Sequence, residues 1–224
     1  MPKKKAVIFD LDGVISDTQR LHFEVDVEVL KSKGIDFPFK RIKRYAGVSD
    51  REFFRELVFK KREFSEKEME KIIEMKYEIL FKKMEGNLKP IKGVIELIKR
   101  LKRNSFRLAV ASSSPKKAVN FVLSSFKIKK YFDVILSRED VVKAKPDPEI
   151  YLKAAKLLKL KPEDCLVIED SPSGIKAAKS AGMKCIAIAT TLKREQLKQA
   201  DKIINSFEEL SLKEIYEILS PSNN

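Results

Sequence analysis

Short apolar runs that alternate with longer amphipathic segments are the feature that most constrains how this chain can fold. The runs are rich in β-branched residues and apolar throughout, which is typical of strands that a parallel sheet covers on both faces. The predicted strands are residues 6–9, 106–111, 134–136, 165–168, 184–189 and 202–204. The predicted helices are residues 94–103, 116–126, 149–158, 175–181, 195–199 and 207–219. This alternation predicts right-handed β-α-β units on a parallel sheet, so the expected fold class is α/β.

Residues 19–86 interrupt this rhythm, because they contain amphipathic segments such as LHFEVDVEVL and SDREFFRELVF but no convincing strand. The last helix-like run ends near Gly86, and glycine is a natural helix stop. We therefore expect a helical domain, residues 16–87, inserted after the first strand. Residues 1–15 and 88–224 are expected to form the core domain.

Chemically suggestive groups follow four of the predicted strand ends or the loops beside them. They are Asp10-Leu11-Asp12-Gly13, Ser112-Ser113-Ser114-Pro115, Lys145 and Glu169-Asp170. Ligands collect at the carboxyl ends of the strands in open parallel sheets, so we expect these groups to converge on one crevice. Each alone has an ordinary explanation, as a turn, a helix cap or a surface charge, but four together at one sheet edge favour a site.

Asp10 and Asp12 lie two residues apart, and such residues point to the same side of an extended chain. An isolated pair of this kind is usually a turn. Here it follows a buried strand, and a second acidic pair, Glu169-Asp170, ends a later one. Mg²⁺ takes oxygen ligands and keeps some waters, so two or three carboxylates with one carbonyl are enough to bind it. The pair therefore indicates a Mg²⁺ site, a nucleophile with its acid/base, or both.

Serine and lysine are the groups that a phosphoryl group requires beside such a metal. Ser112 offers a hydroxyl and neighbouring amides, and Lys145 offers a compact positive charge for the non-bridging oxygens. An aspartate can attack phosphorus when a metal relieves their repulsion, and water readily cleaves the resulting acyl phosphate. A second carboxyl can protonate the leaving alkoxide and then accept a proton from the attacking water. Ser-Pro or Asp-Pro pairs at residues 114–115, 147–148 and 171–172 predict three helix starts near these groups.

The formal charge of +14 suits nucleic acid, a membrane surface or anionic metabolites. Lysines are spread over nearly every helical segment and interleaved with Glu, so a solvated surface explains the charge better than a polyanion groove. Cys165 and Cys185 lie in apolar runs, which favours buried reduced thiols. MPKKK is followed by no signal-like stretch, and no apolar run approaches membrane length. We expect a cytoplasmic monomer that binds neither nucleic acid nor a membrane.

The motifs DLDGVISDT, ASSS, KPDPEIY and VIEDSPSGIKAAKSAG, in this order, resemble those of the haloacid dehalogenase (HAD) superfamily, in its β-phosphoglucomutase-like branch. The resemblance implies a Rossmann-like core with a helical cap inserted after the first motif. It implies that Asp10 is the nucleophile and a metal ligand, and that Asp12 is the acid/base and also binds Mg²⁺ through its carbonyl. From the later motifs, the resemblance implies that Ser112, Ser113 and Lys145 bind the phosphate and that Glu169 and Asp170 belong to the metal site.

The same resemblance extends the substrate-binding site toward the predicted cap. Gly13 lets the chain turn away without crowding the phosphate, and Thr18 marks where the chain leaves the core. His22 lies where the branch commonly has a histidine, although packing on a cap helix explains it equally well. YAGVSDREFF resembles the specificity stretch of the family, which makes Gly47 and Arg51 candidate substrate contacts.

The cap stretch also bears on the choice between hydrolase and mutase. Asp50 stands where the mutases have arginine, and Ala46 replaces a basic residue that the mutases carry before the glycine. A mutase has to hold the second phosphate of a bisphosphate, so these changes weaken that alternative, although Arg51 or Arg44 could compensate. The sequence thus predicts a Mg²⁺-dependent phosphatase of small phosphorylated metabolites, with sugar phosphates foremost. The alternatives are a β-phosphoglucomutase and, more remotely, a non-catalytic basic binding protein on the same scaffold.

Overall fold

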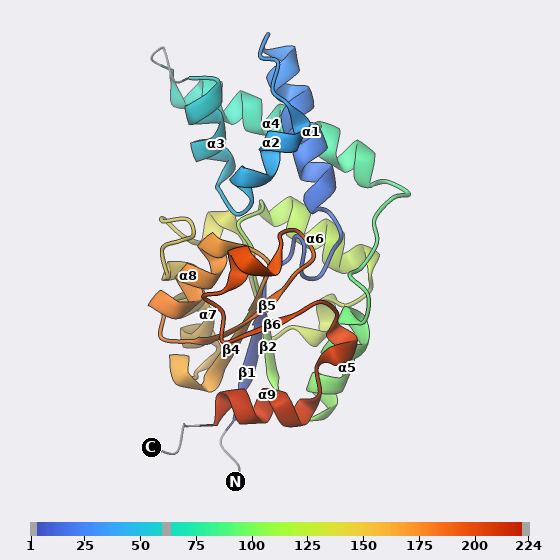
Figure 1. Ribbon diagram of the computed structural model, residues 1–224, viewed down its shortest axis with the longest axis vertical. Helices are drawn as coiled ribbons and strands as arrows, with labels where there is room; N and C mark the ends of the chain where they lie inside the picture. The colour runs from blue at the N-terminus through green and yellow to red at the C-terminus, as the bar shows by residue number, and fades with distance from the viewer. Residues whose placement is uncertain (1–3, 60–63, 221–224) are drawn as a thin grey trace.

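The computed structural model describes residues 4–59 and 64–220, and its centre is a parallel sheet of six strands (Figure 1). The strands run in the order β3-β2-β1-β4-β5-β6, and every neighbouring pair is parallel. Their bounds are β1 Ala6–Phe9, β2 Arg107–Ala111, β3 Val134–Leu136, β4 Cys165–Glu169, β5 Lys184–Ile188 and β6 Lys202–Ile204. The predicted α/β class is therefore confirmed, with β1 and β4 side by side at the middle.

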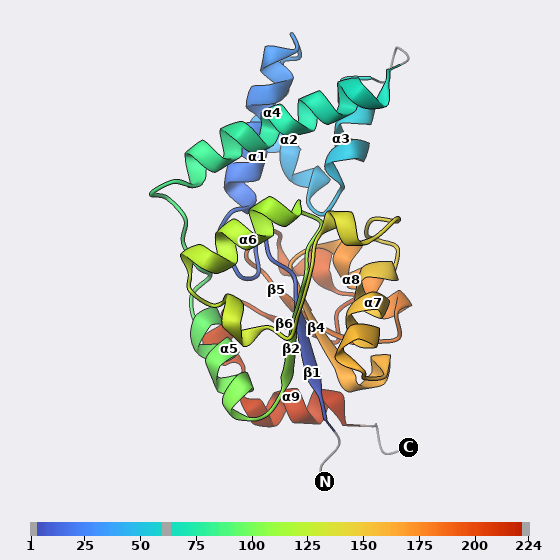
Figure 2. The same ribbon diagram turned by 180° about the vertical axis from the view of Figure 1, so that it is seen from behind.

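Helices cover both faces of the sheet, which explains why its strands lack alternating polar residues (Figure 2). On one face, Val7 and Phe9 of β1 belong to an apolar cluster with the helices α5, α6 and α9. On the other face, Ala6 and Ile8 belong to a cluster with α7 and α8, where many partners are alanines that allow close packing. The bounds of these helices are α5 Val94–Arg103, α6 Lys116–Ser125, α7 Glu149–Leu158, α8 Pro172–Ser180 and α9 Leu212–Leu219.

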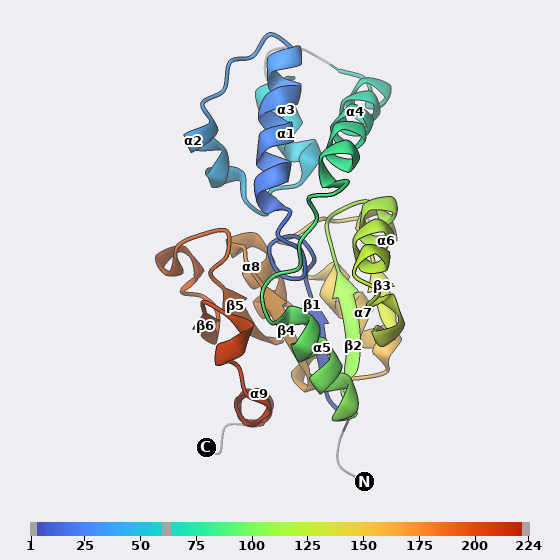
Figure 3. The same cartoon turned by 90° about the vertical axis from the view of Figure 1, so that its right-hand side faces the viewer.

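The four remaining α-helices lie together beyond the carboxyl ends of the strands, and we call them the helical segment (Figure 3). They are α1 Gln19–Ser32, α2 Phe39–Ile42, α3 Asp50–Leu57 and α4 Glu66–Met84. Two stretches of chain connect this segment to the sheet, and they run side by side, with Asp17 N donating to Lys89 O and Ile91 N donating to Ile15 O. The segment is thus joined to the rest of the molecule at a single narrow neck, close to the predicted boundaries at 16 and 87.

The structure differs from the sequence prediction near the carboxyl terminus of the chain. The predicted helix 207–219 is divided into a 3-10 turn, Phe207–Glu209, and the helix α9, because the Ser211 side chain caps a new helix there with Glu214. The predicted helix 195–199 is a 3-10 turn, Arg194–Leu197. Within the described residues, no helix combines the length and the apolar character that crossing a membrane demands.

Candidate active site

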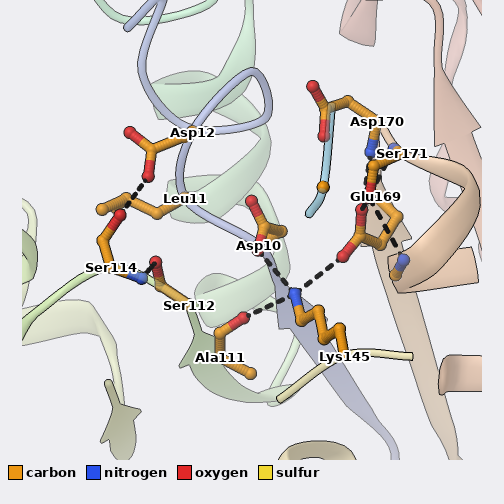
Figure 4. Close-up of polar contacts among 12 residues, drawn as sticks. Asp10, Leu11, Asp12, Ala111, Ser112, Ser114, Lys145, Glu169, Asp170 and Ser171 are labelled. Atoms are coloured by element: carbon orange, nitrogen blue, oxygen red, sulfur yellow. Dashed lines mark hydrogen bonds and ion pairs between the residues drawn. The ribbon is translucent and has the colours of Figure 1, made fainter. Parts of the chain in front are cut away.

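The polar groups predicted from the strand ends do meet at one edge of the sheet, beneath the helical segment (Figure 4). Asp10 and Asp12 follow β1, Ser112 follows β2, and Asp170 follows β4. Lys145 comes from the loop before α7 and lies between the ends of β1 and β4. All five side chains line the same pocket, whose opposite wall is formed by residues of α1, α3 and α4.

Lys145 is the centre of this arrangement. Its Nζ donates to Asp10 Oδ1 at 2.6 Å, to Glu169 Oε1 at 2.7 Å and to the Ala111 carbonyl at 3.1 Å. The ammonium group is buried and also lies 4.8 Å from the centre of the Tyr151 ring. Burial lowers the pKa of Lys145, but the two carboxylates outweigh it and hold that pKa above its ordinary value. Lys145 is therefore a fixed positive charge beside the candidate nucleophile.

Both carboxylate oxygens of Glu169 are engaged by the protein. Oε1 accepts from Lys145 and from the Tyr151 hydroxyl at 2.7 Å, while Oε2 accepts from the amides of Asp170 and Ser171 and from the Ser171 hydroxyl. Burial raises the pKa of Glu169, but Lys145 and these hydrogen bonds keep it below its ordinary value. In this structure Glu169 holds Lys145 in place, and its predicted part in the metal site stays a prediction.

The carboxylates outnumber the cations at this edge of the sheet. Burial raises the pKa of Asp10 to about 7, with Lys145 opposing the shift and Glu169 adding to it. Burial, Glu169 and Asp10 raise the pKa of Asp170 well above its ordinary value. Such shifts indicate negative charge that the protein alone does not balance, and a divalent cation is the usual way to balance it.

The donor atoms available here are oxygens, as a hard cation requires. Asp10, Asp170, Glu169 and the backbone carbonyl of Asp12 are the candidates, and of these carboxylates Glu169 has protein partners on both oxygens. In the described part of the chain, no three His, Cys, Asp or Glu side chains are grouped closely enough to hold a metal by themselves. Two carboxylates and a carbonyl, completed by water and phosphate oxygens, fit Mg²⁺, which keeps several waters.

Gly13 makes room for Asp170 against the turn after β1. Its φ is +80°, and a Cβ on this residue would lie 2.0 Å from Asp170 Oδ2. The Thr191 hydroxyl donates to the same Asp170 oxygen, and the Thr190 hydroxyl donates to the Gly13 carbonyl at 2.6 Å. A larger residue at position 13 would therefore displace a candidate metal ligand, which is a stronger constraint than the phosphate contact predicted from the sequence.

Asp12 points away from Lys145, toward the neck and the helical segment. Its Oδ1 accepts from the Thr18 hydroxyl, and its Oδ2 accepts from the Ser114 hydroxyl at 2.7 Å. His22 Nε2 is 3.3 Å from Asp12 Oδ1. Burial raises the pKa of Asp12, but His22 and the two hydroxyls outweigh it and bring that pKa below its ordinary value. Thr18 is thus connected to the site through Asp12, whereas His22 also lines the pocket itself.

The three serines after β2 make different contacts. Ser112 is buried, and its Oγ accepts from the amide of Ser114 at 3.0 Å, which fixes the turn beside Asp10. Ser113 lines the pocket and is half-buried. The predicted cap at Ser114 is wrong, because α6 begins after Pro115 and the Ser114 hydroxyl is used by Asp12. The Ser171 cap on α8 is confirmed, since its side chain accepts from the Gly174 amide.

Gly47 brings the helical segment into direct contact with the core. Its carbonyl accepts from the Ser173 hydroxyl at 2.6 Å, so the loop before α3 touches the first turn of α8. The φ of Gly47 is +75°, and a Cβ there would lie 2.3 Å from Ser173 Oγ. The two parts of the molecule are therefore in contact over the pocket, and this contact depends on a residue without a side chain.

Two arginines that the sequence singled out lie elsewhere. Arg51 forms an ion pair with Glu66 and lines a neighbouring cavity rather than the pocket of Asp10. The Arg44 guanidinium stacks on Tyr45, with its carbon 4.9 Å from the ring centre, and donates to the Tyr45 hydroxyl. The pocket wall formed by the helical segment instead contains a different cation, Lys76.

Lys76 of α4 was missed by sequence reasoning, although the pattern contains a signal for it. It occupies an apolar stripe on α4, four residues from both Ile72 and Leu80, and a lysine at such a position needs an anionic partner. The structure supplies two partners, Asp26 of α1 and Asp50 of α3. Residues so far apart in sequence cannot be paired without the fold.

Comparison with known proteins agrees with this geometry. The sequence profile described as haloacid dehalogenase-like hydrolase matches residues 7–188. A phosphorylated carbohydrates phosphatase of Thermotoga maritima is 37% identical and covers 81% of this chain and 83% of its own length. The β-phosphoglucomutase of Bacillus subtilis is 33% identical, over 95% of this chain and 94% of its own. The crystal structure of β-phosphoglucomutase from Clostridium difficile has a TM-score of 0.86 at 31% identity, and the match covers 97% of each chain.

Proposed function

Because this chain belongs to the haloacid dehalogenase-like hydrolase family, we propose that it is a Mg²⁺-dependent phosphatase of small phosphorylated metabolites, with sugar phosphates foremost. The reaction would proceed through a phosphoryl group on Asp10. The observation that carries this proposal is the contact between Asp10 and Lys145, at 2.6 Å, inside a pocket that Ser112 and Asp12 also line. A nucleophilic carboxylate, a charge for the phosphoryl oxygens and a separate acid/base then lie within one small volume.

In the first half of the reaction, a carboxylate oxygen of Asp10 attacks phosphorus, and the bond from phosphorus to the ester oxygen breaks. Lys145 and the groups around Ser112 bind the non-bridging oxygens, whose charge they stabilise. Asp12 donates a proton to the departing alkoxide. In the second half, Asp12 accepts a proton from water as that water cleaves the acyl phosphate, and inorganic phosphate leaves.

The contacts of Asp12 in this structure suit the second half of the reaction better than the first. The neighbouring His22 and hydroxyls keep its pKa low, which favours the carboxylate that accepts a proton. To donate a proton, Asp12 has to lose some of the contacts that keep its pKa low. We infer that a change in the contact between His22 and Asp12, as the helical segment moves with substrate, adjusts the acid/base.

We assign the Mg²⁺ site to Asp10, Asp170 and the carbonyl of Asp12. When bound there, the metal supplies positive charge that lowers the repulsion between the carboxylates and the phosphoryl group. Glu169 is assigned to hold Lys145, because both of its oxygens are already occupied by hydrogen bonds. We further propose that residues 16–87 are a cap domain, which opens to admit the substrate and closes through the contact between Gly47 and Ser173.

A β-phosphoglucomutase is the second candidate, supported by the similarity to the Bacillus subtilis and Clostridium difficile enzymes. The two candidates differ in a measurable way. A mutase converts β-glucose 1-phosphate to glucose 6-phosphate after priming with the bisphosphate, without net release of phosphate. A phosphatase releases phosphate in proportion to the substrate consumed. The placement of Arg51 and Arg44 outside the pocket favours the phosphatase.

The test is phosphate release from p-nitrophenyl phosphate and from a panel of sugar phosphates, with Mg²⁺ and with EDTA. Asp10→Asn is expected to abolish release, while the matched variant Asp17→Asn, at an exposed aspartate of the neck, retains it. EDTA is expected to stop the wild-type reaction, and Mg²⁺ to restore it. Undiminished turnover by Asp10→Asn would refute the assignment of the nucleophile. Tight RNA binding by a protein that hydrolyses no phosphomonoester would favour the basic binding protein instead.

A further inference from the structure

Lys76 is held between two carboxylates on the wall of the pocket that faces Asp10. Its Nζ is 2.7 Å from Asp26 Oδ1 and is hydrogen-bonded to Asp50 Oδ1. The lysine is 2% exposed and Asp26 is 7% exposed, so both are buried within the helical segment, while Asp50 is half-buried. Each member comes from a different helix, α4, α1 and α3 respectively. We call these three residues the cap triad.

The cap triad also faces the substrate. Asp26, Asp50 and Lys76 all line the pocket that contains Asp10 and Lys145. Asp26 Oδ1 is buried and forms an ion pair with Lys76 Nζ, although the angle of this contact is outside hydrogen-bond geometry. An ionised carboxylate has about four acceptor sites, so Asp26 retains the capacity to accept from a ligand in the pocket that it lines.

The charge of the cap triad is negative overall, with two carboxylates and one ammonium. Among the described residues that line this pocket, the lysines are Lys76 and Lys145, and no arginine accompanies them. Lys145 faces the candidate nucleophile, and both carboxylates of the triad already compete for Lys76. Among the described residues, the wall that faces Asp10 therefore contains two carboxylates, and Lys76, which they share, is its one lysine or arginine.

We propose that the cap triad is a specificity filter that selects phosphomonoesters whose remaining part is neutral and rich in hydroxyl groups, and that it disfavours substrates with a second phosphate. This inference rests on the proposed phosphatase function, because it takes the reacting phosphate to lie beside Asp10. Asp26 and Asp50 accept hydrogen bonds from substrate hydroxyls, and Lys76 orients the two carboxylates toward the pocket.

The physical basis is the contrast between a hydroxyl and a phosphate at the same position. A hydroxyl can donate to Asp26 or to Asp50, because each carboxylate has more acceptor sites than the shared ammonium of Lys76 fills. A phosphate offers only oxygens to carboxylates that are already buried, and like charges at close range reduce affinity strongly. Lys76 cannot compensate for this repulsion, because it is shared between Asp26 and Asp50.

The cap triad also ties three helices together, so a purely structural role has to be separated from selection. A structural role predicts that variants change the melting temperature and lower the affinity for all ligands by the same factor. A filter predicts that the ratio of two affinities changes. Asp50 also lies in the first turn of α3, where an acidic residue stabilises the helix, so the conservative variant Asp50→Glu is included.

The experiment measures the affinities of D-glucose 6-phosphate and D-glucose 1,6-bisphosphate by calorimetry, with the protein carrying Asp10→Asn so that neither is consumed. The monophosphate is expected to bind at least about tenfold more tightly. Asp50→Asn in the same background is expected to reduce this preference by about tenfold, and Asp26→Asn to act in the same direction. Asp50→Glu is expected to preserve the preference, as is the control Asp36→Asn, which removes an exposed carboxylate of the helical segment outside the pocket.

Equal or tighter binding of the bisphosphate would overturn the proposal, and it would indicate that the distal phosphate reaches the neighbouring cavity of Arg51. The proposal would also be overturned if Asp50→Asn and Asp26→Asn left the preference for the monophosphate unchanged, as the control Asp36→Asn is expected to do. Failure of both compounds to bind would overturn it too. Turnover of p-nitrophenyl phosphate by protein with Asp10 intact tests the phosphatase separately. Its absence would refute the proposed function, whereas the ratio of affinities decides the filter.

Discussion

Two buried lysines face the same pocket from opposite sides, and each lies between two carboxylates. Lys145 lies between Asp10 and Glu169 on the core side, and Lys76 lies between Asp26 and Asp50 on the side of the helical segment. In both cases burial lowers the lysine pKa, and the carboxylates outweigh it and hold that pKa above its ordinary value. The same local chemistry therefore occurs twice in one molecule.

The two clusters differ in what holds their carboxylates. On the core side, Asp10 follows β1 directly and Glu169 ends β4, the neighbouring strand, and two backbone amides together with the Tyr151 hydroxyl fix Glu169. On the other side, three separate helices supply the members, and Lys76 is the group that holds both carboxylates. The carboxylates that hold Lys145 thus come from the ends of two neighbouring strands, whereas those that hold Lys76 come from two helices of the helical segment.

Replacing each lysine in turn should distinguish the roles of the two clusters most clearly. Lys145→Met should lower the kcat for p-nitrophenyl phosphate by about 10³-fold, because the phosphoryl oxygens lose a fixed charge in a buried site. Lys76→Met should lower the same kcat far less, but it leaves two buried carboxylates unpaired, which costs about 3–5 kcal/mol of stability. Steady-state kinetics and thermal unfolding measure the two effects. Equal losses of kcat in the two variants would contradict the separation of roles.

Asp12→Asn should have the next largest effect, about 10²-fold in kcat for a sugar phosphate, because general acid–base catalysis is lost. The effect should be smaller for p-nitrophenyl phosphate, whose leaving group needs no proton. Comparing the two substrates in the same variant checks this expectation. A loss that is independent of the leaving group would argue that Asp12 only shapes the site.

Gly47→Ala should affect the contact between the two sides rather than either lysine. A Cβ at this position meets Ser173 Oγ, and the positive φ adds strain, so closure over the pocket is hindered. We expect a loss of about tenfold in kcat/KM for sugar phosphates, with little change in the melting temperature. Val48→Ala alters an exposed neighbour that lines the same pocket without adding a clash, so it should lose less kcat/KM than Gly47→Ala. A large fall in the melting temperature would indicate misfolding instead.

Tyr151→Phe should produce the smallest effect, because it removes one of several donors to Glu169. The loss of a buried hydrogen bond to a charged group should cost about 1–3 kcal/mol of stability and a few-fold in kcat. Chemical denaturation and steady-state kinetics measure these values. A loss of kcat as large as that of Lys145→Met would show that Glu169 takes a more direct part in the reaction than holding Lys145.

The sheet and its reactive edge could be predicted from the sequence because each strand is a contiguous apolar run, and the topology of parallel sheets brings strand ends together. The matching sequence profile and the similar proteins confirm the resemblance to the haloacid dehalogenase superfamily. The helix predicted over 207–219 was wrong for a local reason, since a Ser211–Glu214 capping box restarts the helix. The boundaries at 16 and 87 stay a prediction, as do the compartment and the monomeric state.

The cap triad could not be predicted, because it joins Asp26, Asp50 and Lys76 through the packing of three helices. For Arg51 the sequence suggested a contact that the structure does not show. Its motif position predicted a substrate contact, but its ion pair with Glu66 directs the side chain into another cavity. Long charged side chains are flexible, and the sequence does not state which of several nearby partners they choose.

The most direct test of the central claim is to identify the residue that carries the phosphoryl group. The wild-type protein is mixed with Mg²⁺ and a sugar phosphate, quenched in acid during turnover and treated with borohydride, which reduces an acyl phosphate to an alcohol. Peptide mass spectrometry should find the modification at Asp10, and neither at Asp12 nor in protein carrying Asp10→Asn. Modification at another aspartate, or undiminished phosphate release without any modified residue, would contradict the account.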